Sequence, residues 1–286
     1  MSARTRDPVS VLMVDGRVVD PAAPALAGNL PGVLRGEGIF EAFLVEDGVP
    51  SPFLGEHARR LDHSARLMGM ELAGEELMEG LAEFLPHVAR DAMRVRYTVL
   101  RGLGAQLVRL WIAGPREEPP AEVVLGLSPF RRDPADPLVS AKTVSRAGSQ
   151  RARRLAEDQG AWEALLPTVD GALAECTSCN VFLVRDGVLE TPGEDQGILW
   201  GVTRGAVLRG CRRLGLPVAE GRVPLEHLRD AAEVYVTNAV VGIIPAKAIL
   251  GVRNDLAGTG GPLLAQVRHA YTSERDLTGR TIRATP

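Results

Sequence analysis

The spacing of hydrophobic residues predicts a strand-rich first part of the chain that also holds two helices. Residues 11–19 alternate around Asp15-Gly16, a residue pair favoured in two-residue hairpin turns. Apolar residues recur on one helical face over residues 56–70 and again over residues 72–90. Strands of an antiparallel sheet are predicted at residues 36–45, 93–101, 107–113 and 123–127. We therefore expect an α+β first domain.

The second part of the chain mixes strands with helices. Helices are predicted over residues 149–159 and 203–214, each ended by a glycine. Strands are predicted at residues 161–166, 179–184, 188–190, 234–237 and 242–250. Prolines are frequent between residues 114 and 137, so we place the domain boundary there. The expected organisation is an N-terminal domain over residues 1–114, a linker region over 115–137 and a C-terminal α/β domain over 138–286.

The composition is that of a globular protein, with 45% hydrophobic and 24% charged residues. A net charge of −3 provides no general basic field to attract nucleic acid or an anionic membrane. No apolar run reaches the roughly 20 residues that span a bilayer, and residues 1–10 lack the apolar centre of a signal peptide. Three cysteines leave one unpaired in any disulfide scheme, which favours a reducing cytoplasm.

Lysine is rare in this sequence. Of 33 basic residues only two are lysines, Lys142 and Lys247. Arginine replaces a solvated lysine with little effect, but it does not replace a lysine whose amine must lose its proton, because the guanidinium stays charged. One of the two lysines is therefore a candidate for covalent chemistry, and chance survival is a sufficient explanation for the other.

Several other motifs carry little information about function. Cys176 and Cys179 form a C-x-x-C pair, but no second pair or nearby histidine completes a zinc site, and a strand rather than a helix is expected after them. We interpret both thiols as packing residues. The five histidines lack a metal-binding spacing, so no metal site is predicted. Serine-hydrolase, P-loop and dinucleotide-binding motifs are absent from the sequence.

Six short segments together resemble one family in order and spacing. They are Gly36-Glu-Gly-Ile-Phe-Glu41, His57-Ala-Arg-Arg-Leu61, Ser140-Ala-Lys-Thr-Val-Ser-Arg146, Glu175-Cys-Thr-Ser-Cys-Asn-Val-Phe182, Gly201-Val-Thr-Arg204 and Thr237-Asn-Ala239. The resemblance is to the class IV aminotransferases, the fold-type IV enzymes that use pyridoxal 5′-phosphate (PLP), which include branched-chain and D-amino-acid aminotransferases and 4-amino-4-deoxychorismate lyase. It covers most of the chain and implies a two-domain, D-amino-acid-aminotransferase-like fold, with the cofactor in the cleft between the domains of a homodimer.

The resemblance also implies roles for individual residues. Lys142 would hold PLP as a Schiff base and move the proton during the reaction. Glu175 would contact the pyridine nitrogen and keep it protonated. The resemblance assigns the cofactor phosphate to Arg60, Val202, Thr203 and Thr237, and the substrate to Asn238 and Ala239. Arg35 is expected either to bind a substrate carboxylate or to form a structural ion pair.

The preferred function is amino transfer from an amino acid or amine to a 2-oxo acid. The alternative is aminodeoxychorismate lyase, which eliminates pyruvate to give 4-aminobenzoate. Branched-chain enzymes usually carry a tyrosine five residues after the lysine, where this chain has Ala147, and the preceding Arg146 is nearer to the lyase pattern. The Arg-x-His motif of D-amino-acid enzymes is absent after Arg101. The sequence leaves the amino donor, the acceptor and the handedness of the substrate open.

Overall fold

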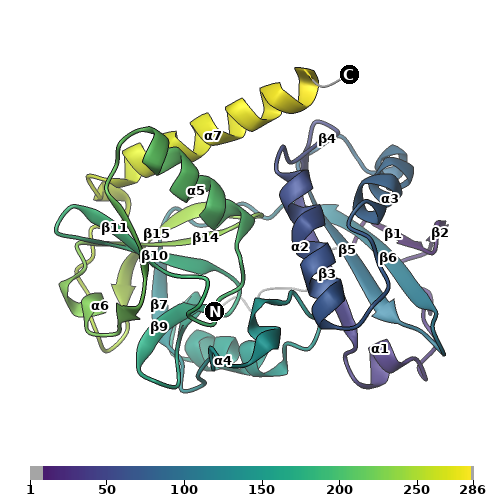
Figure 1. Cartoon of the computed structure of the whole chain (residues 1–286), viewed down its shortest axis with the longest axis horizontal. Helices are drawn as coiled ribbons and strands as arrows, with labels where there is room; N and C mark the ends of the chain where they lie inside the picture. The colour runs from purple at the N-terminus through teal and green to yellow at the C-terminus, as the bar shows by residue number, and fades with distance from the viewer. Residues whose placement is uncertain (1–8, 285–286) are drawn as a thin grey trace. The chain divides into compact units, whose positions relative to one another are not determined.

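The fold is described by a computed structural model, which covers residues 9–284 and therefore leaves most of the segment 1–10 outside the described residues. Its internal contacts divide the chain into two units, and each is described separately (Figure 1). Unit 1 consists of Met1–Glu117 and Ala141–Ser145, and unit 2 of Glu118–Ser140 and Arg146–Pro286. The sequence predicts Lys142 in the C-terminal domain. The structure groups Lys142 with unit 1.

Unit 1 contains a six-stranded antiparallel sheet. Its strand order is β2-β1-β6-β5-β3-β4. The strands are β1 (Val11–Val14), β2 (Arg17–Val19), β3 (Gly38–Glu46), β4 (Val49–Pro50), β5 (Met93–Arg101) and β6 (Leu107–Pro115). Asp15 and Gly16 both have positive φ in the turn between β1 and β2, which confirms the predicted hairpin.

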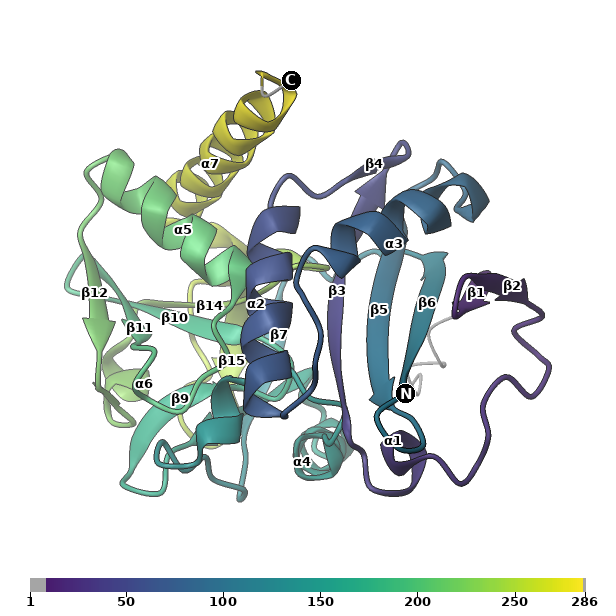
Figure 2. The ribbon, with the colours of Figure 1, turned by 45° about the vertical axis from the view of Figure 1, so that its right-hand side comes forward.

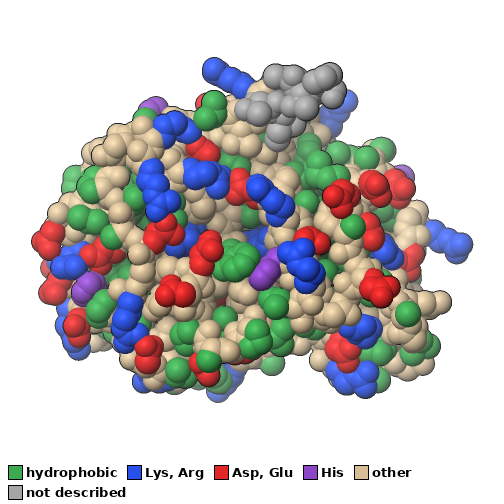
Figure 3. All heavy atoms as spheres, viewed as in Figure 1, with side chains coloured by type: hydrophobic (Ala, Val, Ile, Leu, Met, Phe, Trp, Pro, Cys, Tyr) green, Lys and Arg blue, Asp and Glu red, His purple; other side chains and the backbone are tan. Residues whose placement is uncertain are grey.

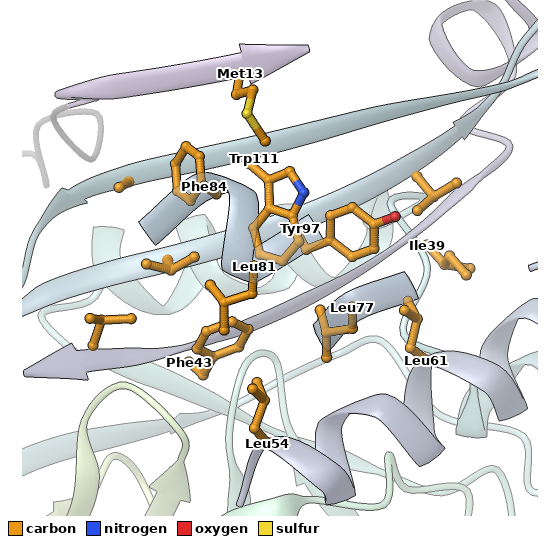
Figure 4. Packing of buried hydrophobic residues seen from close by; sticks show 14 of the residues in the cluster. Met13, Ile39, Phe43, Leu54, Leu61, Leu77, Leu81, Phe84, Tyr97 and Trp111 are labelled. Atoms are coloured by element: carbon orange, nitrogen blue, oxygen red, sulfur yellow. The ribbon is translucent and has the colours of Figure 1, made fainter. Parts of the chain in front are cut away.

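The helices α2 (Leu54–Leu67) and α3 (Glu76–Phe84) pack on one face of this sheet. Phe43, Leu61 and Leu81 belong to the same buried cluster as the stacked rings of Tyr97 and Trp111, whose centroids lie 4.3 Å apart (Figure 4). The single helix expected over residues 72–90 is shorter in the structure. A 3₁₀ turn, η1 (Leu85–His87), follows α3, and it contains a proline at a position that an α-helix interior does not tolerate. A short helix, α1 (Pro31–Leu34), precedes β3.

Unit 2 is built on a nine-stranded mixed sheet. Its strand order is β12-β11-β10-β14-β15-β7-β8-β9-β13. The strands are β7 (Val123–Leu127), β8 (Glu163–Pro167), β9 (Ala172–Cys176), β10 (Asn180–Arg185), β11 (Val188–Pro192), β12 (Val218–Gly221), β13 (Val223–Pro224), β14 (Glu233–Asn238) and β15 (Gly242–Ile249). The prediction of β7 as a strand is confirmed, but its assignment to the antiparallel sheet of the first domain is wrong. It pairs in parallel with β15 and β8.

The longer helices of unit 2 are α4 (Ala147–Asp158), α5 (Val202–Arg213) and α7 (Leu264–Ala284). The shorter ones are α6 (His227–Asp230) and the 3₁₀ turns η2 (Pro137–Ser140) and η3 (Gly258–Gly260). Helices α5 and α7 lie side by side (Figure 2), where Val207 and Cys211 share an apolar cluster with Val267 and Ala270. None of the helices within residues 9–284 is long and apolar enough to cross a bilayer. Acidic and basic side chains are interspersed on the face shown in Figure 3.

Candidate active site

Lys142 lies in an extended segment of unit 1 that follows the edge of β3. The amide of Phe40 donates to the carbonyl of Lys142 at 2.9 Å, and the amide of Val144 donates to the carbonyl of Gly38 at 2.9 Å. On its other side, the amide of Lys142 donates to Ser64 Oγ on α2 at 3.0 Å. The Lys142 ammonium lies 4.6 Å from the centroid of the Phe40 ring. The half-buried lysine is therefore held by both a strand and a helix.

Arg60, which also lies on α2, forms a buried ion pair with Glu41 of β3. Its Nε donates to Glu41 Oε1 at 2.8 Å and one terminal nitrogen donates to Oε2 at 2.7 Å, which gives a forked pair. His57 Nδ1 bonds the same Oε2 at 2.7 Å. Glu41 and His57 are fully buried, and Arg60 is 7% exposed. Period-two alternation in β3 places Glu41 on the face that α2 covers.

The charges of this cluster follow from its surroundings. Burial on its own would raise the pKa of Glu41, but the charge of Arg60 and the hydrogen bonds from Arg60 and His57 hold it well below its usual range. Burial lowers the pKa of His57, although the bond to Glu41 opposes this shift. A neutral ring with its proton on Nδ1 satisfies Glu41. Within residues 9–284, His57 Nε2 has no hydrogen-bond partner.

Glu175 lies near the end of β9 in unit 2 and is 4% exposed. Its Oε1 accepts from Arg132 at 2.7 Å. Its Oε2 accepts from the Asn180 side-chain amide at 3.3 Å and from the Leu199 backbone amide at 3.1 Å. The carboxylate thus accepts hydrogen bonds from Arg132 and from two neutral donors, and it also interacts with the charge of Arg146.

The backbone N–H groups at the start of α5 and the hydroxyl of Thr237 are candidate anion-binding donors in unit 2. Gly201 occupies the N-cap of α5 and has no side chain to cap the helix, so Val202 and Thr203 present backbone N–H groups at its positive end. Thr237 is 1% exposed, and its Oγ1 has no hydrogen-bond partner among the described residues. A buried hydroxyl without a partner costs free energy in the protein alone. This arrangement fits a bound phosphate.

The side-chain amide of Asn238, expected to contact the substrate, makes hydrogen bonds within unit 2. Its Oδ1 accepts from the amides of Val240 and Val241 at 2.9 Å each. Its Nδ2 lies 3.3 Å from the carbonyl of Ser178 and 3.2 Å from Cys179 Sγ. All the usual hydrogen-bonding positions of this amide are used within the chain. Asn238 therefore holds the turn that contains Ala239.

The remaining sequence candidates have clear surroundings. Arg35 is an exposed partner of Glu37, with Nε 2.6 Å from Oε1, and Arg101 pairs with the other oxygen of Glu37 at 2.9 Å. Cys176 and Cys179 are buried free thiols, as expected of packing residues. Burial raises the pKa of the Cys179 thiol to about 12, so it is unsuited to redox chemistry at neutral pH.

Sequence reasoning missed the residues that support the candidates. Arg132 is separated from Glu175 by 43 positions and Ser64 from Lys142 by 78, and neither pair has a local motif. Arg96 was also missed. Its guanidinium lies 3.6 Å from the centroid of the Phe40 ring, the ring that Lys142 approaches. Strand alternation on β5 would have placed Arg96 on the face of the sheet that carries Phe40, because Phe40 pairs with Thr98.

A family model described as amino-transferase class IV matches residues 38–249. The chain belongs to the class IV aminotransferase family. One relative, from Methanocaldococcus jannaschii and named as a candidate branched-chain-amino-acid aminotransferase, is 32% identical over 84% of this chain and 88% of its own. The D-alanine aminotransferase of Listeria monocytogenes is 29% identical over 85% and 88%. The aminodeoxychorismate lyase of Bacillus subtilis is 27% identical over 82% and 85%.

Solved structures confirm the predicted fold class of this class IV aminotransferase. The branched-chain amino acid aminotransferase of Escherichia coli superposes with a TM-score of 0.83 at 22% identity, covering 93% of this chain and 94% of its own. A PLP-bound aminotransferase of Mycobacterium tuberculosis gives 0.80 at 22% identity, covering 93% and 98%. The predicted cofactor, PLP, is the cofactor of this family. The lysine, the buried Glu175 and the donors around Thr237 fit its aldehyde, its ring nitrogen and its phosphate.

Proposed function

We propose that this class IV aminotransferase transfers an amino group between an amino acid, or a related amine, and a 2-oxo acid, with PLP bound through Lys142. The observation that carries the proposal is the position of Lys142, whose backbone is bonded to both β3 and α2 beside the buried Arg60. The other lysine, Lys247, has a 53% exposed side chain and pairs with Glu122 at 3.2 Å. It has the features of a surface residue.

The roles proposed for the cofactor ligands follow the family resemblance. Arg60, the start of α5 at Val202 and Thr203, and the Thr237 hydroxyl would bind its phosphate. Glu175 would hold a proton at the ring nitrogen, since a nearby carboxylate favours the charged form. When bound, PLP supplies an electron sink for charge that develops at the substrate carbon. Lys142 Nζ would hold the cofactor at rest and, once the substrate amine replaces it, would remove and return a proton.

For the substrate carboxylate, Arg96 is a stronger candidate than Arg35. The Arg96 guanidinium and the Lys142 ammonium both lie near the ring of Phe40, at 3.6 and 4.6 Å from its centroid. The Nε of the half-buried Arg96 donates to Thr98 Oγ1 at 3.0 Å, which would leave its terminal nitrogens to donate to a carboxylate. Arg35 is 66% exposed and already paired with Glu37. We therefore assign the carboxylate to Arg96, with the backbone at Ala239 as a further contact.

A lyase is the second candidate, and Arg146 is the observation that favours it. This residue donates to the carbonyl of Thr177. Burial lowers the pKa of Arg146, and the negative charge of Glu175 opposes that shift. Arg146 is a half-buried cation close to Glu175 and four residues after Lys142, and it is the residue noted above as nearer to the lyase pattern. Aminodeoxychorismate lyase of Bacillus subtilis is also among the relatives.

The test is a half-reaction with no acceptor present. PLP-loaded protein is mixed with single L-amino acids, D-amino acids and R-amines. We expect at least one donor to remove the visible absorbance of the bound cofactor, and pyruvate or 2-oxoglutarate to restore it. No conversion with any donor, together with release of 4-aminobenzoate from aminodeoxychorismate, would replace this function with the lyase.

The two lysines supply matched variants for the same experiment. Lys142→Ala should lower the half-reaction rate by at least about 10²-fold, because the general base is lost, and borohydride should no longer fix the cofactor to the chain. Lys247→Ala should behave as the wild type. Peptide mapping that finds the reduced cofactor on Lys247 would show that the assignment of the lysine is wrong.

We also propose that the protein is a homodimer that acts in a reducing cytoplasm. The family resemblance supports the dimer. Three buried free cysteines support the compartment, since they form no disulfide in the structure.

A further inference from the structure

Ser64 occupies an unusual position on α2. It is fully buried, and its hydroxyl donates to the carbonyl of Arg60 at 2.9 Å, one turn earlier in the helix. With its proton used there, the oxygen accepts from the amide of Lys142 at 3.0 Å. One hydroxyl thus links the helical turn that carries Arg60 to the segment that carries the lysine, 78 positions later in the chain.

We propose that Ser64 is a positioning residue that fixes Lys142 relative to Arg60. The inference rests on the proposed function, because it takes Lys142 as the covalent anchor and Arg60 as a phosphate ligand. Each end of this link is fixed in turn: Glu41 holds the Arg60 guanidinium with two bonds, and the amide of Phe40 holds the Lys142 carbonyl. Ser64 joins these two anchored groups.

The physical need for such a link comes from the lysine side chain. Four methylene groups give it many rotamers, so its backbone must be fixed if the amine is to reach one position reproducibly. A displacement of about 1 Å at a reacting group costs about 10²-fold in rate. The bond from Phe40 fixes the peptide group that follows the Cα of Lys142, and the bond to Ser64 on α2 fixes the peptide group that precedes it.

A hydroxyl that bonds the carbonyl four residues earlier is common in helices and by itself implies nothing. Thr272 and Thr278 make the same bond on α7, at 3.0 and 2.9 Å. Ser64 differs because it also accepts a bond from the residue proposed to carry the cofactor. The test must therefore follow Lys142 and not the helix.

The experiment compares Ser64→Ala with Ser51→Ala in the PLP-loaded enzyme. Ser51 is the matched control, because its hydroxyl accepts from the amide of Phe53 at 3.3 Å at the start of the same helix but does not contact Lys142. We expect the Lys142 amide to exchange with deuterium about five- to tenfold faster in Ser64→Ala, as for the loss of one hydrogen bond. We expect kcat to fall about tenfold or more, with KM for the 2-oxo acid changed less than about twofold.

A further readout is the pH titration of the visible absorbance of the cofactor bound to Lys142, whose midpoint should move in Ser64→Ala and not in Ser51→Ala. Equal exchange, kcat and midpoint in the two variants would overturn the inference. If Ser64→Ala does not fold, Ser64→Cys keeps the size but weakens the acceptor, and intermediate values support the role while wild-type values oppose it. Reduced cofactor on Lys247 would instead overturn the proposed function, and the amide exchange of Lys142 would still report on the bond.

Discussion

The two units support their charged site residues in opposite ways. In unit 1 the group assigned to the cofactor is a cation, Arg60, and its support is Glu41, whose side chain is fully buried. In unit 2 the assigned group is an anion, Glu175, and its supports are Arg132, which is 25% exposed, and the neutral amides of Asn180 and Leu199. In unit 1 one carboxylate balances the charge of Arg60, whereas in unit 2 three donors stabilise the charge of Glu175.

The difference shows how each site residue can stay ionised away from water. A buried guanidinium needs a full opposite charge, and the forked bonds from Arg60 keep Glu41 ionised in return. A carboxylate can instead be stabilised by several hydrogen bonds from neutral groups. The ionised state of Arg60 therefore depends on Glu41 alone among these supports, whereas that of Glu175 depends on several donors. Substitution of the supports distinguishes the two.

The largest expected effect is that of Glu41→Gln. The substitution leaves the buried Arg60 opposite a neutral amide, and we expect a loss of about 3–5 kcal/mol in the free energy of unfolding. Arg132→Gln is the matched change in unit 2 and should cost about 1–3 kcal/mol, since Asn180 and Leu199 still bond Glu175. Chemical denaturation measures both variants. Equal losses of stability in the two variants would contradict the conclusion that Arg60 depends on one partner and Glu175 on several.

The pH dependence of the stability of Glu41→Gln provides a control for this prediction. The pKa of Glu41 is lower in the folded than in the unfolded protein, so its stabilising effect is complete above about pH 4.3, the usual value. Below that it declines by up to about 1.4 kcal/mol per pH unit, because the unfolded chain binds the proton first. Burial lowers the pKa of His57, and the bond to Glu41 opposes this shift. The difference in stability between wild type and Glu41→Gln should therefore narrow as the pH falls from about 4.3 to 3, and a constant difference would contradict the assignment.

A smaller effect is expected from Gly201→Ala, which tests the shared support. The φ of Gly201 is −70°, so alanine is not strained there, but its Cβ would lie 1.8 Å from Asn180 Oδ1. The amide of Asn180 would have to move away from Glu175. We expect a loss of about 1–3 kcal/mol in stability from the overpacking, with weaker PLP binding. Gly148→Ala on α4, where no atom lies within 4 Å, is the control and should not be destabilising. Wild-type stability and PLP affinity in Gly201→Ala would show that Asn180 does not depend on this glycine.

Much of the fold could be predicted from the sequence, because strand alternation and turn residues are local signals. The hairpin at Asp15-Gly16 and the strand β14, which carries Thr237, are predicted correctly, whereas no strand is predicted over β9, which carries Glu175. The pairing of strands is not local. Val123–Leu127 was recognised as a strand but assigned to the wrong sheet, since its period does not encode its parallel partners.

The predictions contain no helix after residue 250, although α7 is the longest helix among the described residues. Its apolar residues in the cluster with α5, Leu264, Val267 and Ala270, lie in the first turns of the helix, and the residues after Tyr271 are mostly polar. A narrow apolar stripe gives a weak periodic signal, and contact with another helix decides the outcome.

The candidate site shows the same division. Short motifs identified Lys142, Arg60 and Glu175, since each segment has its own residue pattern. The supports Glu41, Ser64 and Arg132 reach their partners across 19, 78 and 43 positions. Such contacts exist only after folding, so no local pattern reveals them. They are also the residues on which the charge and the position of the site depend.

The smallest effect is expected from Arg35→Ala, which extends the comparison to an exposed pair. Arg35 and Glu37 have side-chain exposures of 66% and 29%, so water screens their attraction and the pair contributes about 0–1 kcal/mol. Glu37 also keeps its bond to Arg101 in the variant. We expect the free energy of unfolding to change by less than about 1 kcal/mol and KM for a 2-oxo acid by less than about twofold, whereas Arg96→Ala should raise that KM about tenfold or more through loss of a charged hydrogen bond. Steady-state kinetics with pyruvate and 2-oxoglutarate measure both. A rise in KM in Arg35→Ala that matches the rise in Arg96→Ala would make Arg35 a substrate ligand and would remove it from the exposed structural pairs.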